Sequence, residues 1–198
     1  MAEDRNLDRK DGPKRGWWRR LTSPSATWSV LALLIVGLLI GAAGVIGTQV
    51  MVAVTGTNEF CGGACHSMQW DSDEFRQSIH YANRLGIRAG CHDCHIPHAY
   101  PQLLWYKARA GIKDAIGEMR GVISTKEKFE NQRLRMAQEV WAEFRETNSV
   151  NCQHCHVFTP EIIAKQKEMA QPMHQMVLQR QGTCIDCHKG VAHNAPKE

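Results

Sequence analysis

All eight cysteines of the chain stand in four pairs, and a histidine directly follows each pair. Residues 91–95, 152–156 and 184–188 have two residues between the cysteines, whereas residues 61–66, CGGACH, have three. This pattern is typical of covalent c-type haem attachment, because two thiols add to the haem vinyl groups and the next imidazole lies beneath the iron. A single pair would also suit a zinc site or a redox motif. Four pairs that each end in His favour four haems, attached through Cys61, Cys65, Cys91, Cys94, Cys152, Cys155, Cys184 and Cys187.

A long apolar segment precedes the first pair. Residues 21–58 carry no charge, and Trp28 to Val54 is almost continuously apolar. At about 1.5 Å per residue this stretch exceeds the roughly 30 Å hydrocarbon core of a bilayer, so it predicts one membrane-spanning helix. A cleaved signal peptide is the alternative, but its apolar core would be shorter. Gly37 and Gly41 form a GxxxG pair that predicts a helix dimer face, although glycine is common in membrane helices in any case.

Charge on the two sides of this segment predicts its orientation. Basic residues cluster at positions 14–20, and such clusters remain on the cytoplasmic side. We therefore expect a cytoplasmic tail at residues 1–20, a transmembrane anchor at 21–56 and a periplasmic haem domain at 57–198, in a single-pass protein of the bacterial inner membrane. Bacterial haem c is attached on the periplasmic side, which agrees with this orientation.

The balance of charge argues against one class of partner. The chain has 24 basic and 20 acidic residues, and most of the excess lies in residues 1–20. The remainder shows no cluster of Lys and Arg of the kind that binds phosphate backbones. We expect no nucleic-acid partner.

The domain after the anchor is short for four haems. Residues 57–198 offer too little chain for a separate apolar core around each haem, so we predict a mainly α fold of short helices and loops wrapped around the haems. The motifs fall into two pairs by spacing, which suggests a duplicated two-haem unit. Two longer helices are predicted at residues 101–120 and 124–145, the second opening with a capping box of Ser124 and Glu127.

The chain has ten histidines for four predicted haems, enough to supply two axial histidine ligands to most of the irons. His95, His156 and His188 close the regular motifs and are the expected proximal ligands. His92 and His154 lie inside motif loops, where geometry turns them away from their own iron. Four histidines remain for three distal positions: His80, His98, His174 and His193.

Three runs of sequence resemble one known family. Residues 79–88, IHYANRLGIR, together with 91–98, CHDCHIPH, and 184–193, CIDCHKGVAH, are similar to the NapC/NirT family of membrane-anchored tetrahaem quinol dehydrogenases. The resemblance implies three distal ligands: His193 for the haem on His95, His80 for the haem on His188, and His174 for the haem on His156. It gives His98 no role.

The first haem departs from the regular pattern. The resemblance implies that Met68, two residues after His66, binds this iron and leaves a high-spin or labile centre beside the quinol. The three-residue spacer shifts the histidine relative to the haem plane, so the choice between His66 and Met68 stays open. An ordinary apolar contact is the alternative for Met68.

A charged pair downstream suits proton transfer. Lys107 and Asp114 are seven residues apart, so on a helix they share one face. The resemblance places them in a quinol pocket beside the first haem, where a carboxylate accepts a proton and a cation orients the oxygen. A weak exposed ion pair is the alternative. The preceding run Leu103, Leu104, Trp105 and Tyr106 would form the entrance at the membrane surface, unless it packs on haem.

The resemblance implies electron transfer from the quinone pool, through four haems, to a periplasmic reductase or a soluble c-type cytochrome. Reverse flow into the pool, as in ammonia oxidation, uses the same residues and is the alternative. A catalytic multihaem enzyme that reduces a small nitrogen or sulfur oxide would need an open iron in a polar pocket away from the membrane. The only haem with an unusual motif here is the first, next to the membrane anchor, which argues against such an enzyme.

Overall fold

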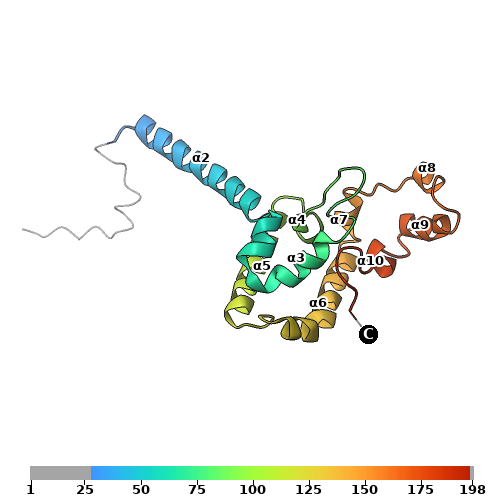
Figure 1. Cartoon of the computed structure of the whole chain (residues 1–198). Coiled ribbons are helices and arrows are strands. Elements are labelled where there is room, and N and C mark those ends of the chain that lie inside the picture. The colour runs from blue at the N-terminus through green and yellow to red at the C-terminus, as the bar shows by residue number, and fades with distance from the viewer. Residues whose placement is uncertain (1–27, 197–198) are drawn as a thin grey trace, which may run out of the picture. The chain divides into compact units, whose positions relative to one another are not determined.

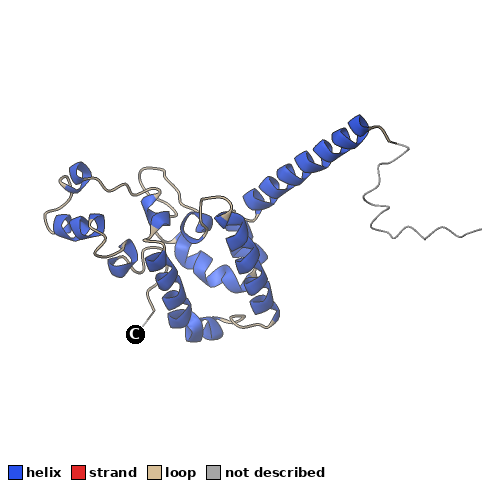
Figure 2. Cartoon of the chain, turned by 180° about the vertical axis from the view of Figure 1, so that it is seen from behind, coloured by secondary structure: helices blue, strands red, loops and turns tan. Residues whose placement is uncertain are grey.

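The structure of the chain is a computed structural model that describes residues 28–196. It contains helices, turns and loops, and no strand among the described residues, which confirms the predicted mainly α class (Figures 1 and 2). Contacts divide the described residues into two units, 28–48 and 49–196. The predicted cytoplasmic tail and its basic cluster lie outside the described residues.

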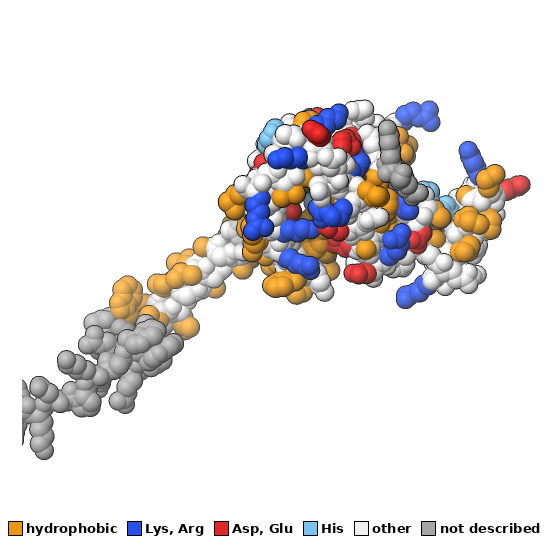
Figure 3. Space-filling view, turned by 90° about the horizontal axis from the view of Figure 1, so that it is seen from below, with side chains coloured by type: hydrophobic (Ala, Val, Ile, Leu, Met, Phe, Trp, Pro, Cys, Tyr) orange, Lys and Arg blue, Asp and Glu red, His pale blue; other side chains and the backbone are white. Residues whose placement is uncertain are grey.

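Helix α2, Val30–Val54, is apolar throughout and contains no charged residue. Its 25 residues correspond to about 37 Å, enough to cross the hydrocarbon core. No residue of this helix is buried, and Figure 3 shows apolar side chains along it. A helix that is hydrophobic on every side is typical of a membrane span, so the predicted single N-terminal membrane helix is confirmed. The Gly37 and Gly41 dimer face stays a prediction.

The domain that follows is built from short helical segments. These are η1 Phe60–Ala64, η2 His66–Met68, α3 Gln69–Arg76, α4 Cys91–His95, α7 Val150–Gln153, α8 Pro160–Ile163, α9 Ala170–Leu178 and α10 Cys184–Cys187. Two long helices lie between the second and third motifs, α5 Gln102–Met119 and α6 Lys126–Glu146. Both were expected from periodicity.

The start of α6 differs from the prediction by one residue. The N-cap is Thr125, whose hydroxyl accepts a hydrogen bond from the Lys128 amide, rather than Ser124. Thr125 has the extended backbone that a cap needs, and the Ser124 hydroxyl instead donates to the Gly121 carbonyl. The capping box of Ser124 and Glu127 was therefore wrong.

The protein interior is small for a domain of this length. Among the described residues only four apolar side chains are buried: Phe75, Phe129, Ile163 and Ile185. A conventional domain of this size would bury many more. The shortage fits a domain whose interior is completed by large apolar cofactors.

Candidate multihaem site

The four cysteine pairs are neighbours in the order of the chain. The Cys91 thiol donates a hydrogen bond to the Cys61 sulfur, which lowers the pKa of Cys61 to about 7. Burial raises the pKa of Cys152 to about 11, and the adjacent Cys184 thiol adds to this shift. Cys94 lies close enough to Cys155 for a charge interaction. These interactions between thiols place motif one next to motif two, motif two next to motif three, and motif three next to motif four.

Hydrogen bonds from polar side chains also join each motif to the next one in the chain. The Cys91 amide donates to Asn58 Oδ1 over 2.8 Å, which joins motif two to the segment before motif one. Asn151 Nδ2 donates to the Cys94 carbonyl over 2.7 Å, and the Ile185 amide donates to Ser149 Oγ over 3.4 Å. These bonds join motif three to two and motif four to three.

The first motif forms a wider turn than the others. Its cysteines lie on and just after the π-helical turn η1, whereas Cys91–His95 and Cys184–Cys187 form single α-helical turns. A π turn absorbs an additional residue, which explains how a three-residue spacer fits. A Cβ built on Gly62 would lie 2.7 Å from Ser72 Cβ, so this position accepts only glycine without movement.

Just beyond this turn the two candidate ligands of the first iron differ in exposure. His66 is exposed, whereas Met68 is half-buried. Between them the buried Ser67 donates a hydrogen bond to Glu118 of α5. This bond ties the first motif to α5, a contact that the sequence interpretation missed. The signal available was the position of Glu118, one turn after Asp114 on the same helix face.

Three pairs of imidazole rings face one another across similar gaps. The ring centres of His95 and His193 are 6.1 Å apart, those of His80 and His156 6.2 Å, and those of His174 and His188 6.1 Å. A metal–imidazole bond is about 2 Å and a ring centre lies roughly 1 Å further, so two imidazoles on opposite sides of one iron have centres about 6 Å apart. The gaps therefore fit an iron between each pair.

The distal assignments that the resemblance implied stay a prediction, and the ring pairs match one of the three. His193 lies opposite His95, as the resemblance implied. In this structure His80 lies opposite His156 and His174 opposite His188. The resemblance implied His80 with His188 and His174 with His156. His174 belongs to the short helix α9, and the fold brings that helix to the last motif rather than to the third.

The rings are held in the state that binds a metal. Burial lowers the pKa of His95 to about 4, which keeps the imidazole neutral. His80 Nδ1 donates to the Val191 carbonyl over 3.3 Å, and His174 Nδ1 donates to Gln166 Oε1 over 2.5 Å. Such bonds select the tautomer whose Nε2 is free for iron.

A cavity of about 300 Å³ opens beside His156. It is lined by Asn148, Gln153, His156, Val157, Phe158, Val177, Leu178 and Arg180. Val157, Phe158, Val177 and Leu178 line it together with polar groups that make up most of its surface, and Arg180 could pair there with a propionate of a bound haem. The thiols, ring pairs and cavity together fit covalently attached haem.

Two histidines without a predicted role meet between motifs two and three. The rings of His98 and His154 stack with centres 4.1 Å apart and planes at 12°. His98 Nε2 also lies 3.1 Å from the Asp93 carbonyl. The two residues are far apart in sequence, so no local pattern could have indicated this contact.

Lys107 and Asp114 both lie near the first motif, on one face of α5. Lys107 Nζ donates to Thr55 Oγ1 over 2.9 Å, and its charge reaches the Cys61 thiol. Asp114 also interacts with Cys61 and Cys65. Burial raises the pKa of Asp114, while burial lowers that of Lys107. A carboxylate with a raised pKa is a better proton acceptor near neutral pH.

The helical domain carries paired thiols with adjacent histidines, and it follows a single membrane helix. These features define a membrane-anchored c-type cytochrome that transfers electrons. Residues 23–198 match the model of the NapC/NirT cytochrome c family, N-terminal region. The chain belongs to this family.

Similar proteins include cytochrome c-type protein TorC of Escherichia coli K12, which is 42% identical over 182 residues, 92% of this chain and 46% of TorC. Cytochrome c-type protein NapC of the same strain is 38% identical over 192 residues, 96% of this chain and 94% of NapC. Denitrification system component NirT of Stutzerimonas stutzeri is 38% identical over 192 residues, 95% of this chain and 94% of NirT. The chain thus spans about half the length of TorC and nearly all of NapC. No solved structure matches the chain.

Proposed function

We propose that this protein oxidises quinol at the outer face of the bacterial inner membrane and passes the electrons through four covalently bound haems to a periplasmic reductase or soluble c-type cytochrome. The observation that carries the proposal is the order of contact among the cysteine pairs, which runs from the pair next to the membrane helix to the pair near the C-terminus. Bound haem supplies one-electron carriers along this order.

The position of α5 supports a quinol site at the first pair. Tyr100 donates a hydrogen bond to Gln49 and Lys107 donates to Thr55, so the start of α5 is bonded to the end of the membrane helix. Quinol dissolved in the bilayer would reach Lys107 and Asp114 without leaving lipid. Of the run predicted as an entrance, Trp105 is exposed, whereas Leu103, Leu104 and Tyr106 are half-buried.

The opposite face of α5 is also suited to lipid. Trp105, Ile112, Ile116 and Met119 are spaced along one side of the helix and all are exposed. Exposed Arg109 lies beside this face, where it would meet lipid headgroups. We expect membrane lipid as a partner here, with the haem domain periplasmic and the N-terminus cytoplasmic.

The reaction releases two electrons and two protons for each quinol converted to quinone. Lys107 donates a hydrogen bond to one quinol oxygen. The Asp114 carboxylate accepts one hydroxyl proton, releases it to periplasmic water and then accepts the second, and bound haem would take up the two electrons one at a time. Met68 is the proposed ligand of the first iron, which its partial burial beside an exposed His66 supports. The other proposed iron ligands are His95 with His193, His156 with His80, and His188 with His174.

Replacement of the charged pair tests the proposal. Purified Asp114→Asn and Lys107→Ala proteins are expected to keep four haems but to lose about 100-fold or more of the rate of haem reduction by a quinol analogue, since positioned proton transfer contributes at least that much. Arg135→Ala is the control, because Arg135 is an exposed cation that bonds Glu139 on the neighbouring helix α6. Reduction by dithionite should be unchanged in all three. Wild-type quinol rates in both site variants would remove the pair from the mechanism.

The raised pKa of Asp114 predicts a dependence on pH. The carboxylate must be deprotonated to accept a proton, so the quinol-driven rate falls as pH drops through its pKa. Because burial raises this pKa, the fall should begin at a higher pH than the ordinary value of about 3.9. Stopped-flow rates across pH would show it, and the slow Asp114→Asn protein should lack this step. An identical step in the variant would assign it to another group.

A further inference from the structure

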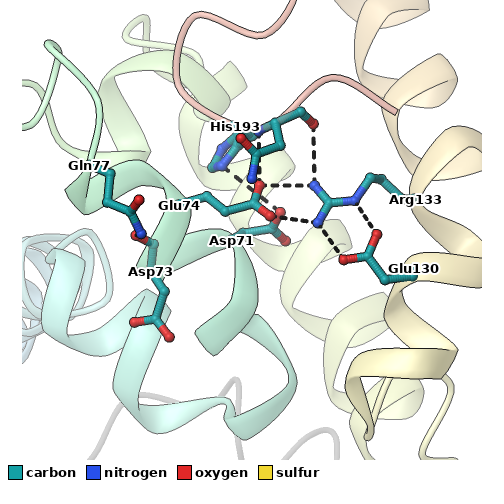
Figure 4. Close-up of polar contacts among 8 residues, drawn as sticks. Asp71, Asp73, Glu74, Gln77, Glu130, Arg133 and His193 are labelled. Atoms are coloured by element: carbon teal, nitrogen blue, oxygen red, sulfur yellow. Dashed lines mark hydrogen bonds and ion pairs between the residues drawn. The ribbon is translucent and has the colours of Figure 1, made fainter. Parts of the chain in front are cut away.

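The segment that carries His193 is fastened by charged residues from two helices. Arg133 of α6 lies between Glu74 of α3 and Glu130 of its own helix (Figure 4). Its Nη2 donates to Glu74 Oε1 over 2.5 Å, its Nη1 donates to Glu74 Oε2 over 2.9 Å, and its Nε donates to Glu130 over 2.7 Å. The Arg133 and Glu74 side chains are only 11% and 16% exposed, so this bidentate pair is poorly screened.

The same two side chains hold the backbone next to His193. The Asn194 amide donates to Glu74 Oε2 over 2.9 Å, and Arg133 Nη1 donates to the Asn194 carbonyl over 3.2 Å. Both polar backbone groups of the residue after His193 are therefore bound. Arg133 also lies over the buried Phe129 ring, with its guanidinium carbon 4.6 Å from the ring centre.

Helix α3 orients the imidazole as well. The Phe75 ring packs against His193 with centres 6.4 Å apart. Asp71 Oδ1 lies 3.9 Å from His193 Nδ1, a nitrogen that has no hydrogen-bond partner within the described residues. Asp71, Glu74 and His193 could together suggest a cation site, but both Glu74 oxygens already accept bonds from Arg133. With Nδ1 directed to α3, Nε2 is left for iron.

The segment also serves a second ring pair. The Val191 carbonyl, two residues before His193, accepts the hydrogen bond from His80 Nδ1. His80 lies opposite His156, whereas His193 lies opposite His95. One short stretch near the C-terminus thus reaches the distal sides of two proposed haems.

We propose that Arg133 and Glu74 are positioning residues for haem ligation. Their hydrogen bonds to Asn194, which we call the clasp, hold residues 191–194 in place. His193 then stays bound to the iron of motif two, and His80 stays aligned on the iron of motif three. The inference rests on the proposed haem ligands but not on quinol chemistry. Arg133 is specifically required, because lysine cannot form the paired bonds to Glu74.

Electron paramagnetic resonance of the purified, haem-loaded full chain tests this clasp. Arg133→Met is expected to keep four covalently attached haems but to show a high-spin ferric signal in addition to that of the first haem, because iron without its distal nitrogen becomes five-coordinate. Added imidazole should restore the low-spin signal, and an unchanged far-ultraviolet circular dichroism spectrum would separate loss of the distal ligand from general unfolding. Arg133→Lys should give a smaller high-spin fraction.

Matched variants separate the clasp from a general loss of stability. Arg135→Met removes an arginine that bonds the exposed Glu139 on the same helix, and it should show no high-spin signal beyond that of the wild-type protein. Asn194→Pro removes the amide that donates to Glu74, whereas Asn194→Ala keeps it, so only the proline variant should become high-spin. If the Arg133→Met protein does not accumulate in cells, the comparison of Asn194→Pro with Asn194→Ala tests the proposal. Wild-type spin state in Arg133→Met or Asn194→Pro, or equal high-spin signals in Arg135→Met, would overturn the clasp. Fewer than four haems in the wild-type protein would instead overturn the proposed function.

Discussion

His80→Ala is expected to remove the most axial of the low-spin ferric signals, whereas His174→Ala removes the most rhombic one. The rings of His80 and His156 are inclined by 70°, and those of His174 and His188 by only 21°. Nearly perpendicular rings leave two iron d orbitals close in energy and give a strongly axial signal. Nearly parallel rings separate these orbitals and give a rhombic signal. Each variant should also gain one high-spin haem, since the iron loses its sixth ligand.

The measurement is low-temperature paramagnetic resonance on oxidised protein. His98→Ala is the matched control, because His98 stacks on His154 rather than facing a proximal histidine, and its spectrum should match that of the wild-type protein. If His80→Ala removed the rhombic signal and His174→Ala the axial one, the ring pairs described here would be wrong. The pairs that the resemblance implied, His80 with His188 and His174 with His156, would then stand.

Gly62→Ala is expected to cost the protein its first haem. A Cβ at this position meets Ser72, whose side chain is buried against the π-helical turn. Either the turn or α3 must move, at a cost of about 1–3 kcal/mol for overpacking. Because Cys61 and Cys65 flank the glycine, movement of the turn displaces a thiol from the haem vinyl group. We expect one haem fewer per chain, measured by pyridine haemochrome absorbance against protein mass.

Gly63→Ala is the control for this substitution. Gly63 is in the same turn, but no atom of the described structure lies within 4 Å of its Cβ position, so this variant should attach all its haems. Adding Ser72→Gly to Gly62→Ala removes the clashing side chain and should restore the first haem. Full haem content in Gly62→Ala alone would show that the turn tolerates a side chain there.

Local patterns predicted the features that depend on neighbouring residues in the chain. The α2 helix follows from an apolar run, and α5 and α6 follow from helical periodicity and turn residues. The cysteine–histidine motifs carry their own chemistry within a few residues. The cap of α6 was misplaced by one residue, because Ser124 and Thr125 are both good caps and only the backbone angles distinguish them.

Contacts across the fold could not be obtained in the same way. The bond from Ser67 to Glu118, the stack of His98 on His154 and the clasp of Arg133 all join residues that are distant in sequence. The distal histidines were recognised as a set, but their assignment to particular irons stays a prediction, and two of the ring pairs differ from it. Nothing in the spacing of His80 or His174 states which motif each will face.

The amino-acid sequence alone determined that this protein has a membrane helix, a helical domain and cysteine pairs suited to covalent haem, because hydrophobic length, periodicity and thiol spacing are properties of short segments. Tertiary structure alone decided which imidazoles face each other, which helix supports the first cysteine pair and what holds the C-terminal ligand. These are relations in space between segments, and they are settled by the packing and hydrogen bonds of the whole domain.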